Sequence, residues 1–551
     1  RPHKPFALMA LSTSSLFNHV NVSKKETAIL NSFHRPIVLL DKKNVTDNTE
    51  LSPFLAPLNT CLGVMLPYTP LHYLLLKKGP DILVMTSGNR SKEPLSIDNK
   101  DALDAFSHIA DYFLFHDRDI YFRADDSIVR VQAGHSRFIR RSRGYAPLPL
   151  DMDIIHGSII EPDMDIPVNK KGSPNNREEM TSNKEETPSI LGCGAEMKNT
   201  ICLTKKSNFF LSQHIGEMNN HKVNDFYNKS IEHLKKIVAV EPEIIAHDMH
   251  PEYMSTQYAN TLARAGKKCF AVQHHHAHAV SCMAENNLTN KVIAITLDGT
   301  GYGTDGNIWG GEILLCTHEN FTRKTQLSYM HMPGGDKAVL EPWRMAASFL
   351  FKTFGKDFLD LDIQYIKEMD SKKLGIIVQM IQKGLNSPLT SSTGRLFDAV
   401  SSLLCLRHII SHESQAAMEL EAVAVKPQSD SYYNADHGTE PGYNLKPYAF
   451  SIIKKNRNIQ THDQYFEIDF VPCIQAIVND LMDEISNTII SRKFHQTLIA
   501  AFADAAGIIA GETCIDSVVL SGGVFNNNLI LTGMIKELEN NNLNVFTHTK
   551  V

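Results

Sequence analysis

The segment Lys291–Gly303, with the sequence KVIAITLDGTGYG, decides the fold class of this chain. Its apolar run up to Leu297 is typical of a buried strand. The strand leads directly into Asp298 and into three alternate glycines, where the backbone can approach a phosphate closely. In α/β proteins, ligands bind at the carboxyl ends of strands. We therefore expect an α/β fold with a ligand site just after Leu297.

A second strand followed by glycines lies late in the chain. The apolar run Val518–Leu520 is followed by Ser521–Asn526, with the sequence SGGVFN. Successive backbone N–H groups in such a turn can bind phosphate oxygens. Two such loops, far apart in sequence, predict two half-domains that close over one nucleotide.

A histidine cluster precedes the first of these loops. Gln273–His278 has the sequence QHHHAH and is followed by a predicted helix over Ala279–Leu288, so His274 and His278 at i and i+4 share one face. This is the spacing of metal ligands, and histidine with a carboxylate such as Asp298 suits iron or zinc. The alternative is that the histidines are polar surface residues and that the glycines form a hairpin turn.

The composition is that of a globular protein of 551 residues, with 42% hydrophobic and 21% charged residues. The length suggests about three to four domains. A formal net charge of −6 gives no basic surplus, so we expect neither nucleic acid nor a membrane as a partner. Apolar stretches such as Thr497–Ala510 are too short or too interrupted to supply the roughly 20 residues that a spanning helix needs. Nine cysteines without a C-x-x-C pair argue against disulfides and zinc knuckles and favour a cytoplasmic location.

Sequence patterns divide the chain into residues 1–149, a linker over 150–188 and residues 189–551. Between Glu161 and Pro188 the sequence is polar and poor in large apolar residues, as in a linker. Elements expected in the first part are strands at Pro36–Leu40 and Ile82–Met85, a helix at Asp98–Ala110, and a hairpin of Asp125–Val131 with Ser136–Arg141. Elements expected in the second part are a hairpin of Ile201–Leu203 with Phe209–Leu211, a strand at Ser517–Leu520 and a surface loop at Pro427–Gly442.

The first part combines many cations with a polar turn after a strand. Thr86–Asn89 follows the strand that begins at Ile82, and Gly88 allows a phosphate to approach. Fixed cations stabilise the negative charge that develops when pyrophosphate departs. The alternative is a solvated charged face beside an ordinary turn. The cations are Arg1, Lys4, Arg118, Arg123, Arg130, Arg140, Arg141 and Arg143.

Four segments of this part, in their order, resemble the YrdC-type domain of the HypF family. They are RPHKPFALM (1–9), LPYTPLH (66–72), TSGN (86–89) and RRSRGY (140–145). The resemblance implies an ATP-binding groove in which carbamate becomes a carbamoyl adenylate and pyrophosphate is released. The positions that it assigns to the nucleotide are Arg1, Lys4, Ser87, Asn89, Arg141 and Arg143.

The second part resembles the carboxyl-terminal, actin-like ATPase (ASKHA) type domain of the same family. The matching segments are GCGAEMKNT (192–200), SQHIG (212–216), HDMHPEY (247–253), the histidine cluster, LDGTGYG (297–303), PGGD (333–336), PWR (342–344), GRLFDAV (394–400) and SGGVFN (521–526). The resemblance implies that His274, His278 and Asp298 bind a divalent metal. It gives Lys198, His214 and Lys337 as weaker assignments, of which Lys198 and His214 are the predicted catalytic residues, and the alternative for His214 is a structural histidine. The positions that it assigns around the nucleotide are Gly299, Thr300, Gly301, Asp398, Gly522, Gly523 and Asn526.

The resemblance therefore implies an α/β protein in which a YrdC-like twisted-sheet domain is followed by a larger actin-like ATPase-type domain. It further implies a carbamoyltransferase of nickel–iron hydrogenase maturation that uses ATP with Mg²⁺, and carbamate or carbamoyl phosphate. The implied acceptor is the carboxyl-terminal cysteine of a HypE-like protein, on which the cyanide ligand of the hydrogenase is made.

The chain departs from the family pattern at both ends. The acylphosphatase-like domain and zinc-finger motifs that usually precede the YrdC-type domain are not in this sequence, and Val551 precedes the place of a Pro-x-Asn-Asp-Gly motif. We therefore expect both domains to be incomplete. Two alternatives stay open: carbamoylation of another acceptor, either a tRNA adenosine or a small-molecule hydroxyl, and a nucleotide- or partner-binding remnant without turnover.

Overall fold

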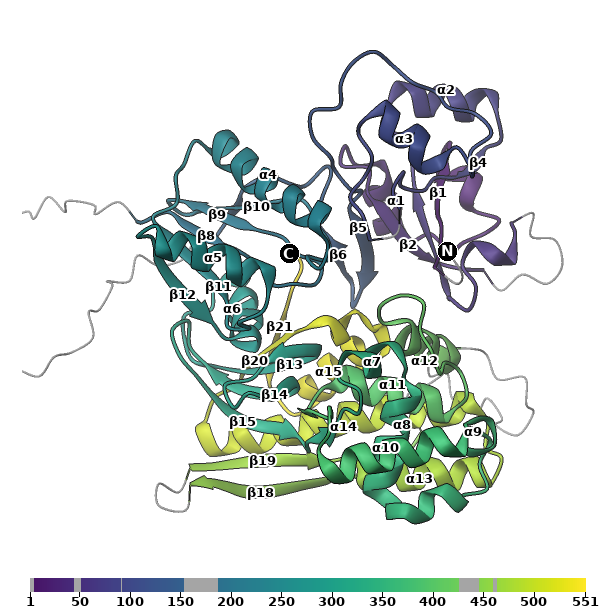
Figure 1. Ribbon diagram of the computed structural model, residues 1–551, viewed down its shortest axis with the longest axis vertical. Coiled ribbons are helices and arrows are strands. Elements are labelled where there is room, and N and C mark those ends of the chain that lie inside the picture. Colours follow the sequence, from purple (N-terminus) through teal and green to yellow (C-terminus); the bar gives the residue numbers. More distant parts are fainter. Residues whose placement is uncertain (1–3, 44–50, 91, 153–186, 426–444, 459–462) are drawn as a thin grey trace, which may run out of the picture.

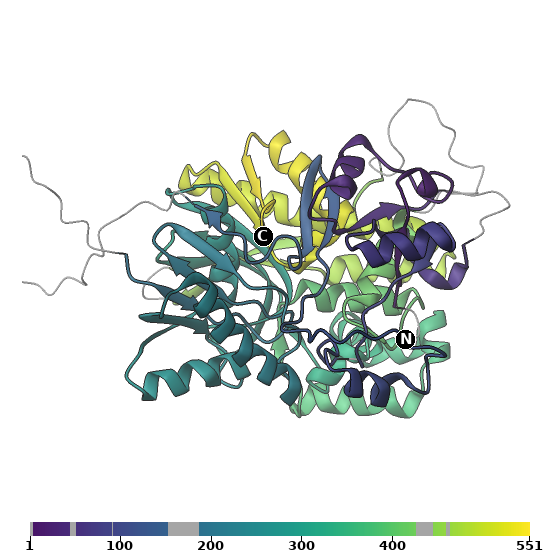
Figure 2. The same ribbon diagram turned by 90° about the horizontal axis from the view of Figure 1, so that it is seen from above.

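The computed structural model describes residues 4–43, 51–90, 92–152, 187–425, 445–458 and 463–551. These residues form three sheets with helices around them (Figure 1). The first sheet and its helices lie beside the second sheet, and the third sheet with a large group of helices lies below both (Figures 1 and 2). Arg1, most of the predicted linker and the whole of the loop at Pro427–Gly442 lie outside the described residues.

The first sheet has six strands in the order β4-β1-β3-β2-β5-β6. Leu8, Val38 and Val64 are fully buried in its core, because apolar residues recur along the central strands. The predicted strands, the helix after Asp98 and the closing hairpin are confirmed. The elements are β1 (Ala7–Ala10), α1 (Lys24–Asn31), β2 (Ile37–Asp41), β3 (Cys61–Met65), α2 (Pro70–Lys78), β4 (Ile82–Val84), α3 (Asn99–Phe106), β5 (Ile128–Gln132) and β6 (His135–Arg140).

The second sheet has the order β12-β11-β8-β9-β10-β7. Its edge strand β7 (Leu150–Asp151) pairs with β10, so the first two residues of the predicted linker belong to a sheet. Helix α4 covers the sheet with an apolar stripe that includes Val223, Phe226 and Leu234. The other elements are β8 (Ile190–Gly192), β9 (Cys202–Lys205), β10 (Asn208–Leu211), α4 (His221–Val238), β11 (Ile244–Asp248), α5 (Met254–Arg264) and β12 (Lys268–Val272).

The third sheet has its main strands in the order β18-β19-β15-β14-β13-β20-β21. Strand β13 pairs antiparallel with β14 and parallel with β20, which brings the two glycine-bearing segments to neighbouring strands. The strands are β13 (Val292–Tyr302), β14 (Ile308–Cys316), β15 (Phe321–Leu327), β16 (Met330–His331), β17 (Leu389–Thr390), β18 (Ser451–Asn458), β19 (Asp463–Asp469), β20 (Ser517–Ser521) and β21 (Asn544–Thr547).

Helices pack on the third sheet and form the largest hydrophobic core of the protein. Helix α14 (Asn487–Thr513) is long and apolar enough to cross a membrane by length and composition, so the expectation that no stretch reaches that length was wrong. In the fold, 61% of its most apolar window is buried, with Phe494 and Phe502 inside the core. The other helices are α6 (His274–Glu285), α7 (Asp336–Leu340), α8 (Trp343–Phe354), α9 (Gln364–Glu368), α10 (Ser371–Lys383), α11 (Thr393–Leu403), α12 (Gln415–Val425), α13 (Val471–Met482) and α15 (Asn528–Asn540).

Candidate metal and nucleotide site

Helix α6 begins at His274, earlier than the predicted start at Ala279. The side chain of Gln273 caps the helix by accepting a hydrogen bond from the backbone N–H of His276 at 2.8 Å. The histidine cluster therefore forms the first turns of the helix. This places His274 and His278 one turn apart on the same face, as the spacing predicted, with ring centroids 5.0 Å apart.

Both of these histidines point at Asp298. The Nε2 atoms of His274 and His278 lie 3.4 Å and 3.6 Å from Oδ2 of Asp298. One donor atom from each of the three side chains lies within 4.8 Å of the other two. Burial alone would raise the pKa of Asp298, but hydrogen bonds and positive charge from the two histidines outweigh it and hold this pKa well below its usual value. An ionised carboxylate between two imidazoles is a donor set that fits iron or zinc.

Asp248 orients the first of these histidines. It lies at the end of β11, and its Oδ2 atom is 2.7 Å from Nδ1 of His274. This contact leaves Nε2 of His274 directed toward Asp298. Burial opposes the charge on His274, but Asp248 and Asp298 together raise its pKa to about 10. A carboxylate that holds the second nitrogen of a metal-binding histidine is a common supporting feature of metal sites. The sequence motif around Asp248 was noted, but no role was assigned to this residue.

Asp298 lies within a strand and not after its end, so this part of the prediction was wrong. Strand β13 continues to Tyr302, with a shift in its pairing to β14 between Leu297 and Gly301. Gly301 is required by its surroundings, because a Cβ atom there would lie 2.4 Å from Cε1 of His275 and 2.8 Å from Cδ2 of His274. The glycine lets β13 lie directly against the histidine helix.

The second glycine-bearing segment reaches the same point. Gly522 has a φ of 108°, and a Cβ there would lie 2.3 Å from the carbonyl oxygen of Leu297. The backbone N–H of Gly523 donates to Oδ1 of Asp298 at 3.1 Å. The two segments thus meet at Asp298, as expected for two loops of one site. Asn526, also predicted to contact the nucleotide, accepts a hydrogen bond from Gln132 of the first domain through its backbone oxygen at 3.0 Å.

The start of helix α11 also contacts the site, in addition to β13 and the segment after β20. Oγ of Ser392, its capping residue, donates to the carbonyl oxygen of Gly299 at 2.6 Å. Next to Gly299, Thr300 is partly buried. The carboxylate of Asp398 is buried against Nε of Arg395 at 2.7 Å, and burial, opposed by Arg395, raises the pKa of Asp398. The contact of Asp398 with a nucleotide stays a prediction.

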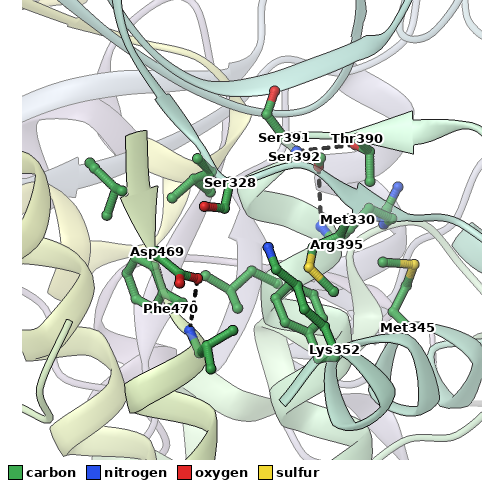
Figure 3. A pocket seen from close by; sticks show the side chains of 15 residues that line it. Ser328, Met330, Met345, Lys352, Thr390, Ser391, Ser392, Arg395, Asp469 and Phe470 are labelled. Carbon is green, nitrogen blue, oxygen red and sulfur yellow. Dashed lines mark hydrogen bonds between the residues drawn. The ribbon is translucent and has the colours of Figure 1, made fainter. Parts of the chain in front are cut away.

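A small cavity lies next to this helix start (Figure 3). Ser392 and Arg395 line it together with Lys352 from α8. In Figure 3, Oγ of Ser392 accepts a hydrogen bond from the backbone N–H of Arg395, and this contact caps α11. None of the residues predicted for the site lines this cavity.

A chain of hydrogen bonds supports the second histidine ligand. Nδ1 of His278 lies 3.3 Å from Oγ of Ser521, which lies 2.9 Å from Nε2 of His548. Nδ1 of His548 lies 2.9 Å from Oε2 of the buried Glu285. Arg137 of the first domain donates to the backbone oxygen of His548. The first domain is therefore connected by hydrogen bonds to a candidate metal ligand.

The two predicted catalytic residues lie where the first two sheet domains meet. Burial, followed by the charges of Arg140, Lys198 and Lys4, lowers the pKa of His214 to about 3. Lys4 and Arg140 come from the first domain, whereas Lys198 and His214 come from the second. Nζ of Lys198 lies 3.2 Å from Oε1 of Glu413. The fold thus brings a neutral histidine together with three cations from separate parts of the chain.

The other residues predicted to bind nucleotide in the first domain have protein partners. Oγ of Ser87 donates to Oδ1 of Asn89 at 2.6 Å. Arg141 donates to the backbone oxygens of Tyr145 and Leu148, both at 3.0 Å. Arg143 pairs with Asp126 at 2.7 Å. Their roles in nucleotide binding stay predictions.

Three family models match the chain in sequence order. Residues 1–142 match a model described as "Telomere recombination", of the YrdC type. Residues 185–285 match "HypF Kae1-like domain", and residues 294–551 match "Carbamoyltransferase, Kae1-like Domain, second subdomain".

Similar proteins extend this match over nearly the whole chain. "Carbamoyltransferase HypF" of Synechocystis sp. is 34% identical over 98% of this chain and 64% of its own length. "Carbamoyltransferase HypF2" of Cupriavidus necator is 33% identical over 99% of this chain and 65% of its own length. The chain thus spans slightly less than two thirds of these relatives.

A crystal structure of full-length HypF in a phosphate- and nucleotide-bound form superposes with a TM-score of 0.84. It is 39% identical, and the match covers all of this chain and 77% of that one. The HypF structure from T. kodakarensis gives a TM-score of 0.82 at 33% identity. These matches confirm the predicted fold class, in which a YrdC-like domain precedes a Kae1-like domain.

Proposed function

The chain belongs to the HypF family of carbamoyltransferases, and from this membership we propose that it transfers a carbamoyl group in an ATP-dependent reaction that serves nickel–iron hydrogenase maturation. The observation that carries the proposal is the meeting of His274, His278 and Asp298 beside the N–H of Gly523. A metal-binding cluster beside a glycine turn suits a substrate that combines a phosphate ester with a reactive carbonyl.

The proposed reaction has two steps. In the first domain, a carbamate oxygen attacks the α-phosphorus of ATP, which forms carbamoyl adenylate and releases pyrophosphate. In the second domain, a thiolate attacks the carbamoyl carbon, the bond to the AMP oxygen breaks, and AMP leaves. The products are an S-carbamoyl cysteine and AMP, and the thiol proton passes to a base or to water. Carbamoyl phosphate serves as a source of carbamate only after its phosphate is hydrolysed away.

Cations support the passage of an anionic intermediate between the domains. Lys4 and Arg140 from the first domain and Lys198 from the second all affect the pKa of His214, so each of them lies near this histidine. Arg140 and Lys198 also pair with Asp125 and Glu413. Carbamoyl adenylate carries a negative charge on its phosphate, and clustered cations attract it. Because its pKa is about 3, His214 is neutral at physiological pH, and its ring nitrogens can donate one hydrogen bond and accept another.

The residues around Asp298 have separate roles in holding a metal. His274, His278 and Asp298 would supply the donor atoms, Asp248 fixes the ring of His274, and Gly523 holds the second oxygen of Asp298. Iron or zinc bound there supplies Lewis acidity toward a carbonyl or phosphoryl oxygen. Burial of Asp298 strengthens its attraction for a cation relative to the same group in water. ATP is expected to enter with Mg²⁺ as its counter-ion.

The proposed acceptor is the carboxyl-terminal cysteine of a HypE-like protein, and the proposed location is the cytoplasm. All nine cysteines of the chain are free thiols, which fits a reducing compartment. We expect neither nucleic acid nor a membrane among the partners.

Pyrophosphate release and peptide carbamoylation test the two steps separately. The full chain is incubated with ATP, carbamate, iron or zinc, and a peptide that ends in cysteine. We expect pyrophosphate release and S-carbamoylated peptide, and His278→Ala should lose the peptide product while it keeps pyrophosphate release. His221→Ala is the matched control, because His221 is 87% exposed on α4 and its ion pair is with Asp225 of the same helix. Absence of both products from a folded protein that binds ATP contradicts the proposal, and label found on tRNA in place of the peptide would change the acceptor.

A further inference from the structure

A second group of possible metal ligands lies in the helical part of the third-sheet domain. Within the described ranges, only two groups of His, Cys, Asp and Glu side chains bring three donor atoms within 4.8 Å of one another. One is the site already described, and the other consists of Glu368, Cys405 and His408. Glu368 ends α9, and Figure 1 shows α9 at the far side of this domain from α6.

Both ring nitrogens of His408 have hydrogen-bond partners, and Nε2 is the one that faces Glu368. Its Nδ1 atom lies 2.8 Å from Oγ of Ser402, a fully buried residue of α11. Because a carboxylate accepts, Nε2 carries the hydrogen that Glu368 receives in the absence of a metal. A metal at Nε2 would take the place of that hydrogen, and Nδ1 could then donate to the hydroxyl of Ser402. Nε2 lies 3.0 Å from Oε2 of Glu368. This is close to the distance between two ligand atoms of one tetrahedral zinc ion, roughly 3.3 Å for bonds of about 2.0 Å.

Glu368 is held in a similar way. Its Oε1 atom accepts a hydrogen bond from Nε2 of Gln364 at 2.9 Å, one turn earlier on α9. Oε2 is therefore the oxygen that faces His408 and the cysteine. Gln364 thus contacts Oε1 of Glu368, and Ser402 contacts Nδ1 of His408. The other two donor atoms of these side chains, Oε2 and Nε2, face each other.

The backbone places the thiol at this point. Cys405 follows the end of α11 with a φ of 53°, and its N–H donates to the backbone oxygen of Ser402. Burial, assisted by the charge of Glu368, raises the pKa of the Cys405 thiol to about 12. Sγ of Cys405 donates to the backbone oxygen of Leu403 at 3.9 Å and lies within 4.8 Å of the donor atoms of Glu368 and His408. A thiolate, an imidazole and a carboxylate form a donor set that zinc prefers over Mg²⁺ or Ca²⁺.

We propose that Glu368, Cys405 and His408 bind a zinc-class divalent cation that ties α9 to the end of α11. On binding, the sulfur–metal bond replaces the S–H bond of Cys405 and one proton is released to solvent. Three protein ligands leave one position of a tetrahedral ion for water. This site contains a sulfur ligand, whereas the site at Asp298 does not, so the absorption spectra of the two sites differ when Co²⁺ is bound. The proposal does not depend on the carbamoyl transfer reaction.

Cobalt(II) is the probe, because its thiolate complexes absorb in the near ultraviolet. The full chain is titrated with Co²⁺ as wild type and as the double variant His274→Ala, His278→Ala. We expect a thiolate-to-cobalt band in both proteins and loss of the band in Cys405→Ser. Zn²⁺ should abolish the band by displacement, since zinc binds such ligands more tightly than cobalt. Ser402→Ala should weaken Co²⁺ binding roughly 10- to 100-fold.

Cys514→Ser is the matched control, because Cys514 also follows a helix with a positive φ, of 56°, but belongs to neither group. It should keep the full band. If Cys405→Ser fails to fold, Glu368→Gln on the exposed end of α9 tests the same ligand set through a loss of affinity of tenfold or more. The absence of a band at saturating Co²⁺, or a band of wild-type intensity in Cys405→Ser, overturns the proposal.

Discussion

Gly301→Ala is expected to disrupt the metal site through the histidine helix. The added Cβ would lie 2.4 Å from Cε1 of His275 and 2.8 Å from Cδ2 of His274. Ordinary carbon contacts begin near 3.4 Å, so the two rings must move by about 1 Å and about 0.6 Å. His275 is completely buried and has little room to move. The motion must therefore be shared with α6, which carries both histidine ligands.

The expected effect is a loss of metal affinity on the order of 10- to 100-fold, comparable to the loss of a residue that orients a ligand. Metal affinity is measured without nucleotide, by competition with a coloured chelator. Gly299→Ala is the matched control in the same motif, because its Cβ would meet nothing within 4 Å. An equal loss in both variants, or no loss in Gly301→Ala, would refute the argument that glycine is needed for the approach of β13 to α6.

Asp248→Asn replaces the carboxylate at Nδ1 of His274 and should weaken metal binding roughly 10- to 100-fold in the same competition assay; an unchanged affinity contradicts its orienting role. Ser521→Ala should have a smaller effect, because its contact with His278 is 3.3 Å and that of Asp248 with His274 is 2.7 Å; a larger loss would reverse this order. Burial lowers the pKa of His495 to about 4, below the ~6.5 of an exposed histidine, so the unfolded chain binds the proton first and stability falls as the pH drops from about 6.5 to about 4. Between pH 7 and pH 5, urea unfolding should show a fall in stability about 2 kcal/mol larger for wild type than for His495→Gln, and equal falls contradict the assignment.

The sequence predicted the meeting of the two glycine-bearing segments but not the path of the backbone between them. The apolar pattern of β13 ends at Leu297, and glycines carry no side chains that could show a strand period. Its continuation to Tyr302 depends on pairing with Ile308 and Trp309 of β14. That pairing is a tertiary contact, which local pattern does not contain.

The start of α6 was missed for a related reason. Its first turn consists of histidines that face a ligand site, so they show no apolar period, and Gln273 is not one of the residues that most often cap helices. Asp248 was missed because its neighbour His274 is distant in sequence. The two meet since β11 pairs in parallel with β12, with Asp248 opposite Val272, just before the helix.

In the first domain, residue type alone does not decide which groups the arginines contact. Arg141 and Arg143 are candidates for phosphate binding because of their charge and their match to family positions. The same charge also fits the contacts of Arg143 in the structure, where it pairs with Asp126 and stacks on Tyr68. Sequence identifies a cation, but its partners depend on how the turn after β6 packs on the sheet. The cluster of Lys4, Arg140, Lys198 and His214 likewise requires the contact between two domains.

Transfer of an isotope-labelled carbamoyl group to a cysteine-ended peptide tests the central claim most directly. The full chain, supplied with ATP, labelled carbamate and iron or zinc, is followed through one turnover with peptide label and AMP measured together. We predict that label and AMP appear in equal amounts with wild type, and that Asp298→Asn releases pyrophosphate but leaves the peptide unlabelled. Peptide labelled by Asp298→Asn at the wild-type rate, or labelled without ATP, would contradict the account.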